Sequence, residues 1–197
     1  MNEPGALRFF FDYVDPFSLI LSRRLQVLEK EGTVKVEPWP LEVNPPPRPL
    51  LQPEAPAWAA RWEIAMREEE ALGLGMEPPW IVPWTRKAHE LAFYGREENR
   101  FEEIHQGLFR AYLTEGRDIG RVDVLVELAR EAGLDPLEAK AVLDVDRHRT
   151  DVETARARGI REGVEGIPCL LRNGRVLHGN PSPEEIRRFL ASNADTV

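Results

Sequence analysis

The clearest chemical groups in this sequence are a carboxylate and a hydroxyl three positions apart, in the run Asp15-Pro16-Phe17-Ser18. Aspartate followed by proline is typical of a helix start, with Asp15 as the N-cap residue. We expect the helix N-terminus to lower the pKa of Asp15, which would make it a poor acid and a weak base at neutral pH. As a nucleophile, Ser18 lacks an identifiable histidine partner. Asp15 and Ser18 are therefore candidate catalytic residues that local helix capping would also explain.

The single cysteine, Cys169, directly follows Pro168. One cysteine excludes an intrachain disulfide and a zinc cluster built on thiolates. Strand alternation points its side chain toward the core, where a free thiol behaves as a small hydrophobe. The histidines show no metal-ligand spacing, so we predict no metal site and expect each ring to be exposed or to cap a helix. They are His89, His105, His148 and His178.

The chain around Cys169 predicts a β-hairpin. Pro168 opens an apolar strand, and Asn173-Gly174 is the dipeptide typical of a two-residue type I′ turn. Ser182-Pro183 then begins a closing amphipathic helix, with the serine as N-cap. The last part of the chain therefore reads as strand, strand and helix.

The first part of the chain predicts a β-α-β unit. Leu7–Phe11 is an apolar run typical of a buried strand, and the helix that begins after Asp15 should stop at Gly32. Residues 33–39 alternate apolar and charged side chains, as a half-buried strand does. We expect this second strand to return parallel to the first. A connector rich in proline follows at residues 43–56.

The middle of the chain has helical periodicity and no strand alternation. The predicted helices cover residues 58–72, 86–94, 97–114, 123–132 and 150–159, with one more beginning at 135. We therefore expect two subdomains, an inserted helical one at residues 58–157 and a second one made of residues 1–57 and 158–197. Four tryptophans are expected to pack the helices against the connector, namely Trp58, Trp62, Trp80 and Trp84.

The composition of the chain argues against some classes of binding partner. The 34 acidic residues outnumber the 26 basic ones and give a formal charge of −8, which argues against nucleic acid as a partner. The apolar run from Phe9 to Leu21 is interrupted by Asp12 and Asp15, so we do not expect it to cross a membrane. No secretory signal pattern is present at the start, and we expect a cytoplasmic protein.

The order of elements resembles the DsbA-like family of thioredoxin-fold proteins, and within it the FrnE-type branch. That branch is related to 2-hydroxychromene-2-carboxylate isomerases and kappa-class glutathione transferases. The similar strings are residues 11–18, Thr85-Arg86-Lys87-Ala88-His89, and residues 108–119, 124–129, 133–135 and 163–171. The resemblance implies a thioredoxin-like α/β fold with a large all-helical insertion. It also implies that Pro168 is cis and that Phe17, Ile167 and Pro168 line a ligand cleft.

The resemblance also shows what is missing. Redox-active members carry Cys-Pro-x-Cys where this chain has Asp15-Pro16-Phe17-Ser18, and neither Asp15 nor Ser18 can form or break a disulfide. The isomerase relatives have a serine at the first position, which is thought to hydrogen-bond the thiolate of bound glutathione. A carboxylate there would oppose a thiolate by roughly 1 kcal/mol at 4 Å in water. Asp15 would then act only when protonated, turned away, or used as a base toward the thiol.

Three functions stay open. The first is a DsbA/FrnE-like protein without dithiol redox activity that binds a small thiol or peptide ligand beside Pro168. The second is a glutathione-dependent isomerase or transferase that uses Asp15 in place of serine, with glutathione as its cofactor. The third is a non-catalytic partner-binding module. Nothing in the sequence determines the oligomeric state, and a homodimer is one open arrangement.

Overall fold

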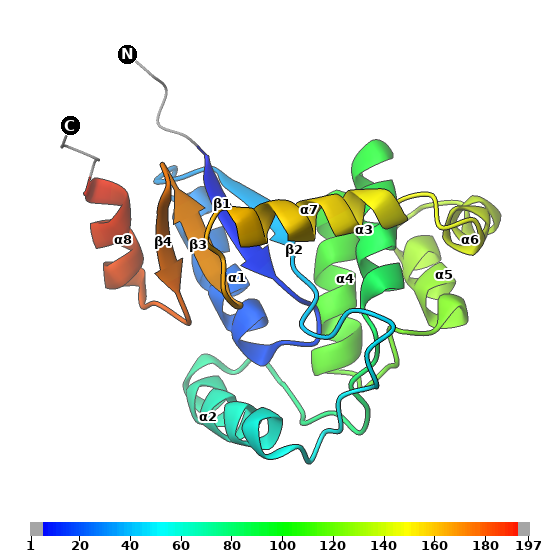
Figure 1. Ribbon diagram of the computed structural model, residues 1–197, viewed down its shortest axis with the longest axis horizontal. Helices are drawn as coiled ribbons and strands as arrows, with labels where there is room; N and C mark the ends of the chain where they lie inside the picture. The colour runs from blue at the N-terminus through cyan, green and yellow to red at the C-terminus, as the bar shows by residue number, and fades with distance from the viewer. Residues whose placement is uncertain (1–5, 193–197) are drawn as a thin grey trace.

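The computed structural model describes residues 6–192 and contains one four-stranded sheet with helices on both of its faces (Figure 1). The strands are β1 (Leu7–Phe11), β2 (Val36–Pro40), β3 (Cys169–Arg172) and β4 (Arg175–His178). The helices are α1 (Pro16–Lys30), α2 (Pro56–Leu72), α3 (Arg86–Glu97), α4 (Phe101–Leu113), α5 (Val122–Glu131), α6 (Pro136–Asp144), α7 (Arg149–Arg161) and α8 (Pro183–Ala191). In the described part of the chain, none of these helices combines the length and apolarity that crossing a membrane requires.

The sheet has the order β2-β1-β3-β4 and confirms the predicted thioredoxin-like arrangement. Strands β1 and β2 are parallel, whereas β3 runs antiparallel to both β1 and β4. Asn173 and Gly174 have φ values of 51° and 73°, as a type I′ turn requires. The two prolines of β2 are tolerated because β2 is an edge strand.

Several predicted boundaries were wrong, among them the end of α3, which lies at Glu97 and not at Tyr94. β2 begins at Val36 and not at Thr33, because its neighbour β1 begins at Leu7, which pairs with Val36. The helix predicted from Glu97 begins only at Phe101. The chain between α3 and α4 is broken by Asn99, whose φ of 57° lies outside the helical region.

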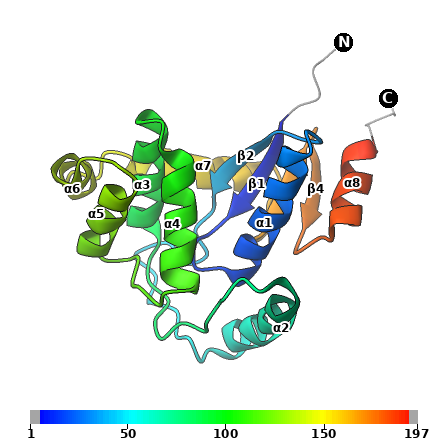
Figure 2. The same cartoon turned by 180° about the vertical axis from the view of Figure 1, so that it is seen from behind.

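The two faces of the sheet are covered by different helices. Figure 2 shows α1 and α8 on one face, and Figure 1 shows α7 across the other. A Cβ atom on Gly159 of α7 would lie 2.6 Å from Cε1 of Phe10 in β1. Only a glycine therefore lets α7 lie this close to the sheet.

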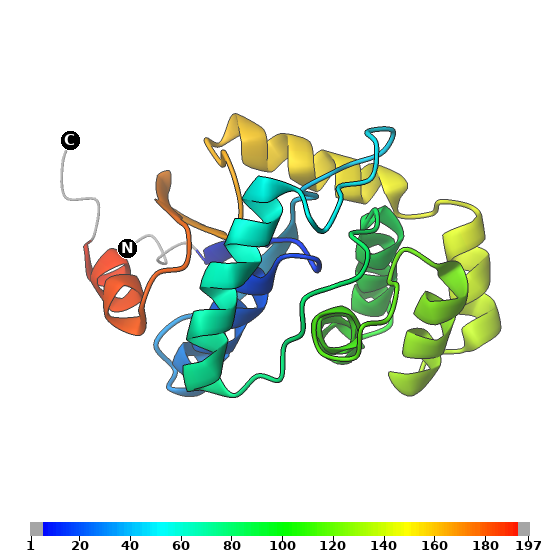
Figure 3. The same ribbon diagram turned by 90° about the horizontal axis from the view of Figure 1, so that it is seen from below.

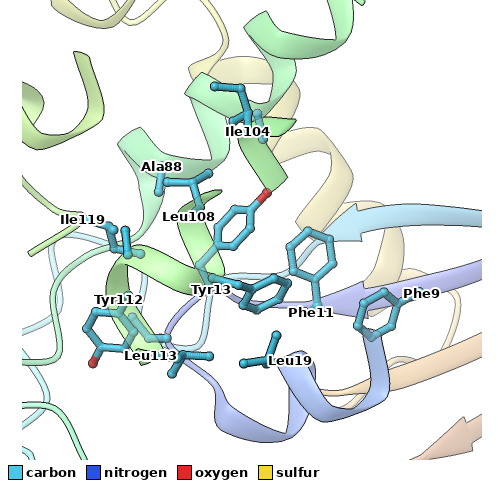
Figure 4. Packing of buried hydrophobic residues seen from close by; sticks show 14 of the residues in the cluster. Phe9, Phe11, Tyr13, Leu19, Ala88, Ile104, Leu108, Tyr112, Leu113 and Ile119 are labelled. Atoms are coloured by element: carbon cyan, nitrogen blue, oxygen red, sulfur yellow. The ribbon is translucent and has the colours of Figure 1, made fainter. Parts of the chain in front are cut away.

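One hydrophobic cluster extends from the sheet into the helical insertion. Figure 4 shows Phe11 of β1 beside Tyr13, and Leu108 and Tyr112 of α4 belong to the same cluster. The Phe11 and Tyr13 rings meet edge to face with their centroids 5.1 Å apart. This shared packing holds the loop between β1 and α1, which carries the candidate site, against the inserted helices.

Candidate functional site

Asp15 is the N-cap of α1, as predicted, and its side chain is completely buried. Its Oδ2 atom accepts hydrogen bonds from the Ser18 backbone N–H at 2.7 Å and from the Ser18 hydroxyl at 2.6 Å. Ser18 is also fully buried. The two candidate catalytic residues are therefore in direct contact, and the serine hydroxyl is a donor to a carboxylate.

Arg61 of α2 connects the two halves of the site. Its Nε atom donates to Asp15 Oδ1 at 2.5 Å, and its Nη2 atom donates to the carbonyl oxygen of Ile167 at 2.7 Å. The guanidinium carbon also lies 4.9 Å from the centroid of the Phe17 ring. We call these contacts of Arg61 with Asp15 and Ile167 the Arg61 bridge. Figure 3 shows α2 lying across the end of the sheet at which α1 begins.

The expected direction of the Asp15 pKa was wrong. Burial raises the pKa of this carboxyl above its ordinary value, and the Arg61 guanidinium and the Ser18 hydrogen bonds offset only part of that rise. The sequence argument considered the helix N-terminus and omitted the loss of water around the side chain. At this position desolvation raises the pKa of Asp15 more than the helix N-terminus lowers it.

The peptide bond between Ile167 and Pro168 is cis, as the resemblance implied. The Pro168 carbonyl accepts a hydrogen bond from Gly179 N–H at 2.9 Å, and Pro168 itself is buried. Ile167 is half-buried. Its carbonyl oxygen is part of the Arg61 bridge, and the residue also lines a pocket. The structure thus brings Asp15, Phe17 and Ile167 together around one arginine.

A pocket of about 530 Å³ opens beside the Arg61 bridge. It lies between the connector that follows β2, α2, α7 and the loop before β3. Its wall includes Val43, Leu51, Trp58, Arg61, Arg156 and Ile167. Of the three residues predicted to line a ligand cleft, Ile167 lines this pocket, whereas Phe17 and Pro168 are not among its lining residues.

A second buried contact positions the wall of this pocket. Asp12 is completely buried, and its Oδ2 atom accepts a hydrogen bond from the backbone N–H of Val43 at 2.7 Å. The other carboxylate oxygen lies 3.1 Å from Nε2 of His89 on α3. Asp12 N–H also points to the Ser18 hydroxyl at 3.4 Å. Asp12 therefore ties β1, the connector and α3 together next to the candidate site.

The histidine expectation was wrong for His89 and His105, which lie inside helices, whereas His148 occupies the N-cap position of α7 although its side chain makes no capping hydrogen bond. His89, His105 and His148 are buried, and only His178 is exposed. The Tyr13 hydroxyl lies 3.0 Å from Nδ1 of His105, and burial lowers the pKa of His105 to about 3. This ring is neutral at physiological pH because the aromatic cluster around it excludes water. Within residues 6–192, no group of three or more histidine, cysteine or acidic side chains is arranged to hold a metal ion.

Two of the four tryptophans are buried, as the packing prediction requires, and Trp84 contacts the connector through a hydrogen bond to Arg48. Trp58 and Trp62 of α2 are buried, whereas Trp80 and Trp84 are 68% and 40% exposed. The exposed rings still donate hydrogen bonds, from Trp80 to the Gly116 carbonyl and from Trp84 to the Arg48 carbonyl.

Comparison with known proteins identifies the family of this chain. The DSBA-like thioredoxin domain matches residues 6–191. The chain belongs to this family. An uncharacterized protein of Bacillus subtilis, YwbO, is 28% identical over 178 residues, which cover 88% of this chain and 89% of that protein.

Solved structures of DsbA-like proteins share the fold. A probable DsbA oxidoreductase from Streptomyces coelicolor superposes with a TM-score of 0.81 at 19% identity, covering 94% of this chain and 88% of the other. A 2-hydroxychromene-2-carboxylate isomerase gives a TM-score of 0.75 at 16% identity and covers 89% of each chain. The cytosolic disulfide reductase DsbM from Pseudomonas aeruginosa, solved with GSH, gives 0.67 at 18%, covering 94% of this chain and 97% of the other.

Within this DSBA-like chain the only thiol is inaccessible. Cys169 is fully buried on β3, which confirms that it faces the core, and burial raises its pKa to about 12. A thiol in this environment is protonated at neutral pH and is a poor nucleophile.

Arg61, Asp12 and Arg156 are the site residues that sequence reasoning missed. Arg61 and Arg156 lie in charged helices where the sequence shows no feature that separates them from neighbouring arginines. Asp12 and His89 each lie in a string that resembles the family, but nothing in the sequence indicated that they contact each other.

Proposed function

We propose that this DSBA-like protein binds a small thiol or peptide ligand in the pocket beside Pro168 and does not exchange disulfides. The observation that carries this proposal is the state of Asp15, at the position where redox-active relatives have their nucleophilic cysteine. Its carboxylate is buried and held by Arg61 and Ser18. The helix end that would stabilise a thiolate is therefore occupied by a group that cannot transfer electrons.

We expect no activity in an insulin-reduction assay, because disulfide exchange needs an accessible thiolate and Cys169 is buried. Wild type and Cys169→Ser should both match buffer. The matched control is the triple variant Asp15→Cys, Ser18→Cys and Arg61→Ala, which places two thiols at the start of α1 and removes the side chain that contacts position 15, and it should gain measurable reductase activity. Wild-type activity that persists in Cys169→Ser would contradict the proposal.

A glutathione-dependent isomerase or transferase is the second candidate, and Arg61 favours it. The guanidinium beside Asp15 offsets the carboxylate charge that would otherwise oppose a bound thiolate. One of the structural neighbours is a 2-hydroxychromene-2-carboxylate isomerase, and another, the disulfide reductase DsbM, was solved with GSH. In this function the ligand first displaces part of the cover over the buried Asp15 carboxylate, which then accepts the glutathione thiol proton, and Arg61 remains to pair with the thiolate.

A calorimetric titration of glutathione at pH 6 and pH 8 tests this candidate. Binding to wild type should weaken at pH 8 as the thiol begins to ionise beside the Asp15 carboxylate. Asp15→Ser should bind glutathione more tightly at pH 8, by up to about tenfold, because Arg61 is then free to pair with the thiolate. Absence of binding to both proteins would remove glutathione and leave the first function.

A further inference from the structure

The wall of the pocket beside the Arg61 bridge is mainly aliphatic. Its apolar side chains include Leu41, Val43, Leu51, Ile160, Val164 and Ile167. Trp58 is the one aromatic residue among those that line it. A flexible saturated chain can follow such a wall, whereas a planar aromatic ligand would find a single ring to stack on.

The charges around this pocket are not balanced. Arg61 is paired with Asp15, and Glu42 is held by the Arg86 guanidinium at 3.0 and 2.9 Å. Two further arginines that line the pocket, Arg48 and Arg156, form no ion pair with any described residue. Glu165 is the only unpaired carboxylate in the wall, and it is exposed. The pocket therefore has an excess of positive charge in a chain whose formal net charge is −8.

Two buried donors in this wall lack acceptors. Nε of Arg156 and Nε1 of Trp58 are both buried and have no hydrogen-bond partner among residues 6–192. The Trp58 side chain is only 6% exposed. Both N–H groups belong to residues that line the pocket, and buried N–H groups are nearly always satisfied in folded proteins, so an acceptor oxygen of a ligand would satisfy them after a small shift of these side chains.

We propose that this pocket binds an aliphatic carboxylate of the medium-chain fatty-acid class. The carboxylate pairs with the Arg156 guanidinium, whose fork geometry matches two carboxylate oxygens. The alkyl chain lies along the aliphatic wall and is removed from water. This inference rests on the proposed function in one respect, namely that a ligand occupies the pocket beside Pro168.

Calorimetric titration of the full chain with octanoate, octanamide and butanoate tests the two halves of this ligand. Octanoate should bind at least about tenfold more tightly than octanamide, which lacks the charge, and than butanoate, which lacks four methylenes. Arg156→Gln should weaken octanoate by about tenfold or more and leave octanamide unchanged. The matched control is Arg161→Gln on the same helix, an exposed arginine outside the pocket wall, which should change neither affinity.

A second variant keeps the inference testable if Arg156→Gln fails to fold. Ile160 lines the pocket but is 49% exposed, so Ile160→Glu should fold, and it should weaken octanoate more than octanamide because the new carboxylate repels only the charged ligand. Equal affinity of wild type for octanoate and octanamide, or octanoate binding that survives Arg156→Gln, would overturn the inference.

Glutathione titrated in parallel separates the two proposals. Glutathione binding without octanoate binding would overturn the fatty-acid inference and leave the proposed thiol site standing. Charge-dependent octanoate binding without glutathione binding would support the inference and remove the thiol as ligand. Absence of binding by every compound would count against both.

Discussion

Arg61→Met should lower the free energy of unfolding by about 3 kcal/mol at neutral pH. The change removes the guanidinium that pairs with Asp15 and leaves a carboxylate with no exposure to water. Loss of one partner of a buried ion pair typically costs about 3–5 kcal/mol. We expect the lower end because the Arg61 side chain is 29% exposed, so water can reach part of the site. Denaturant unfolding measures the change.

The cost of Arg61→Met should increase with pH. The pKa of Asp15 is raised in the folded protein above its ordinary value of 3.8, so the folded state binds this proton more tightly than the unfolded state. The contribution of Asp15 to stability is therefore greatest below that ordinary value and falls as pH rises through the folded pKa. Arg61 lowers the pKa of Asp15 in the folded protein. Removing Arg61 therefore raises this pKa further, and the free energy of unfolding decreases more as the pH rises. The difference between variant and wild type should be smallest near pH 4 and largest at neutral pH.

Two controls isolate the buried charge. Arg67→Met on the same helix removes an exposed arginine that pairs with exposed Glu63, and it should cost less than about 0.5 kcal/mol. Adding Asp15→Asn to Arg61→Met removes the unpaired carboxylate and should restore part of the loss at neutral pH. An Arg61→Met effect that is the same at pH 4 and pH 7 would show that lost packing, and not the Asp15 charge, is responsible.

Asp12→Ala should lower the free energy of unfolding by about 3 kcal/mol. The substitution leaves two buried groups without their acceptor, the Val43 N–H and the His89 ring. Each unsatisfied buried donor costs about 1–3 kcal/mol. Because Val43 lines the pocket, Asp12→Ala should also weaken whatever ligand the pocket holds. Chemical denaturation gives the stability change, and titration of the same variant gives the change in affinity.

Asp12→Asn is the matched variant, since its amide keeps one acceptor oxygen, and it should lose about half as much stability as Asp12→Ala. His178→Gln changes an exposed histidine and should be neutral within about 0.5 kcal/mol. If alanine and asparagine at position 12 destabilise the protein equally, the carboxylate charge rather than the two hydrogen bonds dominates, and our account of Asp12 is wrong.

The local signals in the sequence were sufficient for most of the fold. The strand β1, the Asp15 and Ser182 caps and the Asn173-Gly174 turn were predicted correctly. Each depends on residues within a few positions of one another, through backbone φ preferences, capping hydrogen bonds and side-chain periodicity. The start of β2 was predicted wrongly because the start of an edge strand depends on the length of the strand it pairs with, which is distant in the sequence.

By itself, the sequence determined that the chain has one thiol, that the position of the family's nucleophilic cysteine is occupied by Asp15, and that a helix begins there. Only the tertiary structure decided what surrounds that carboxylate. Arg61 is 46 positions from Asp15 and 106 from Ile167, and no local pattern relates these three residues. Burial reversed the expected direction of the Asp15 pKa, and it placed His89 against Asp12. Desolvation and long-range pairing depend on which surfaces pack together, and that is a property of the whole fold.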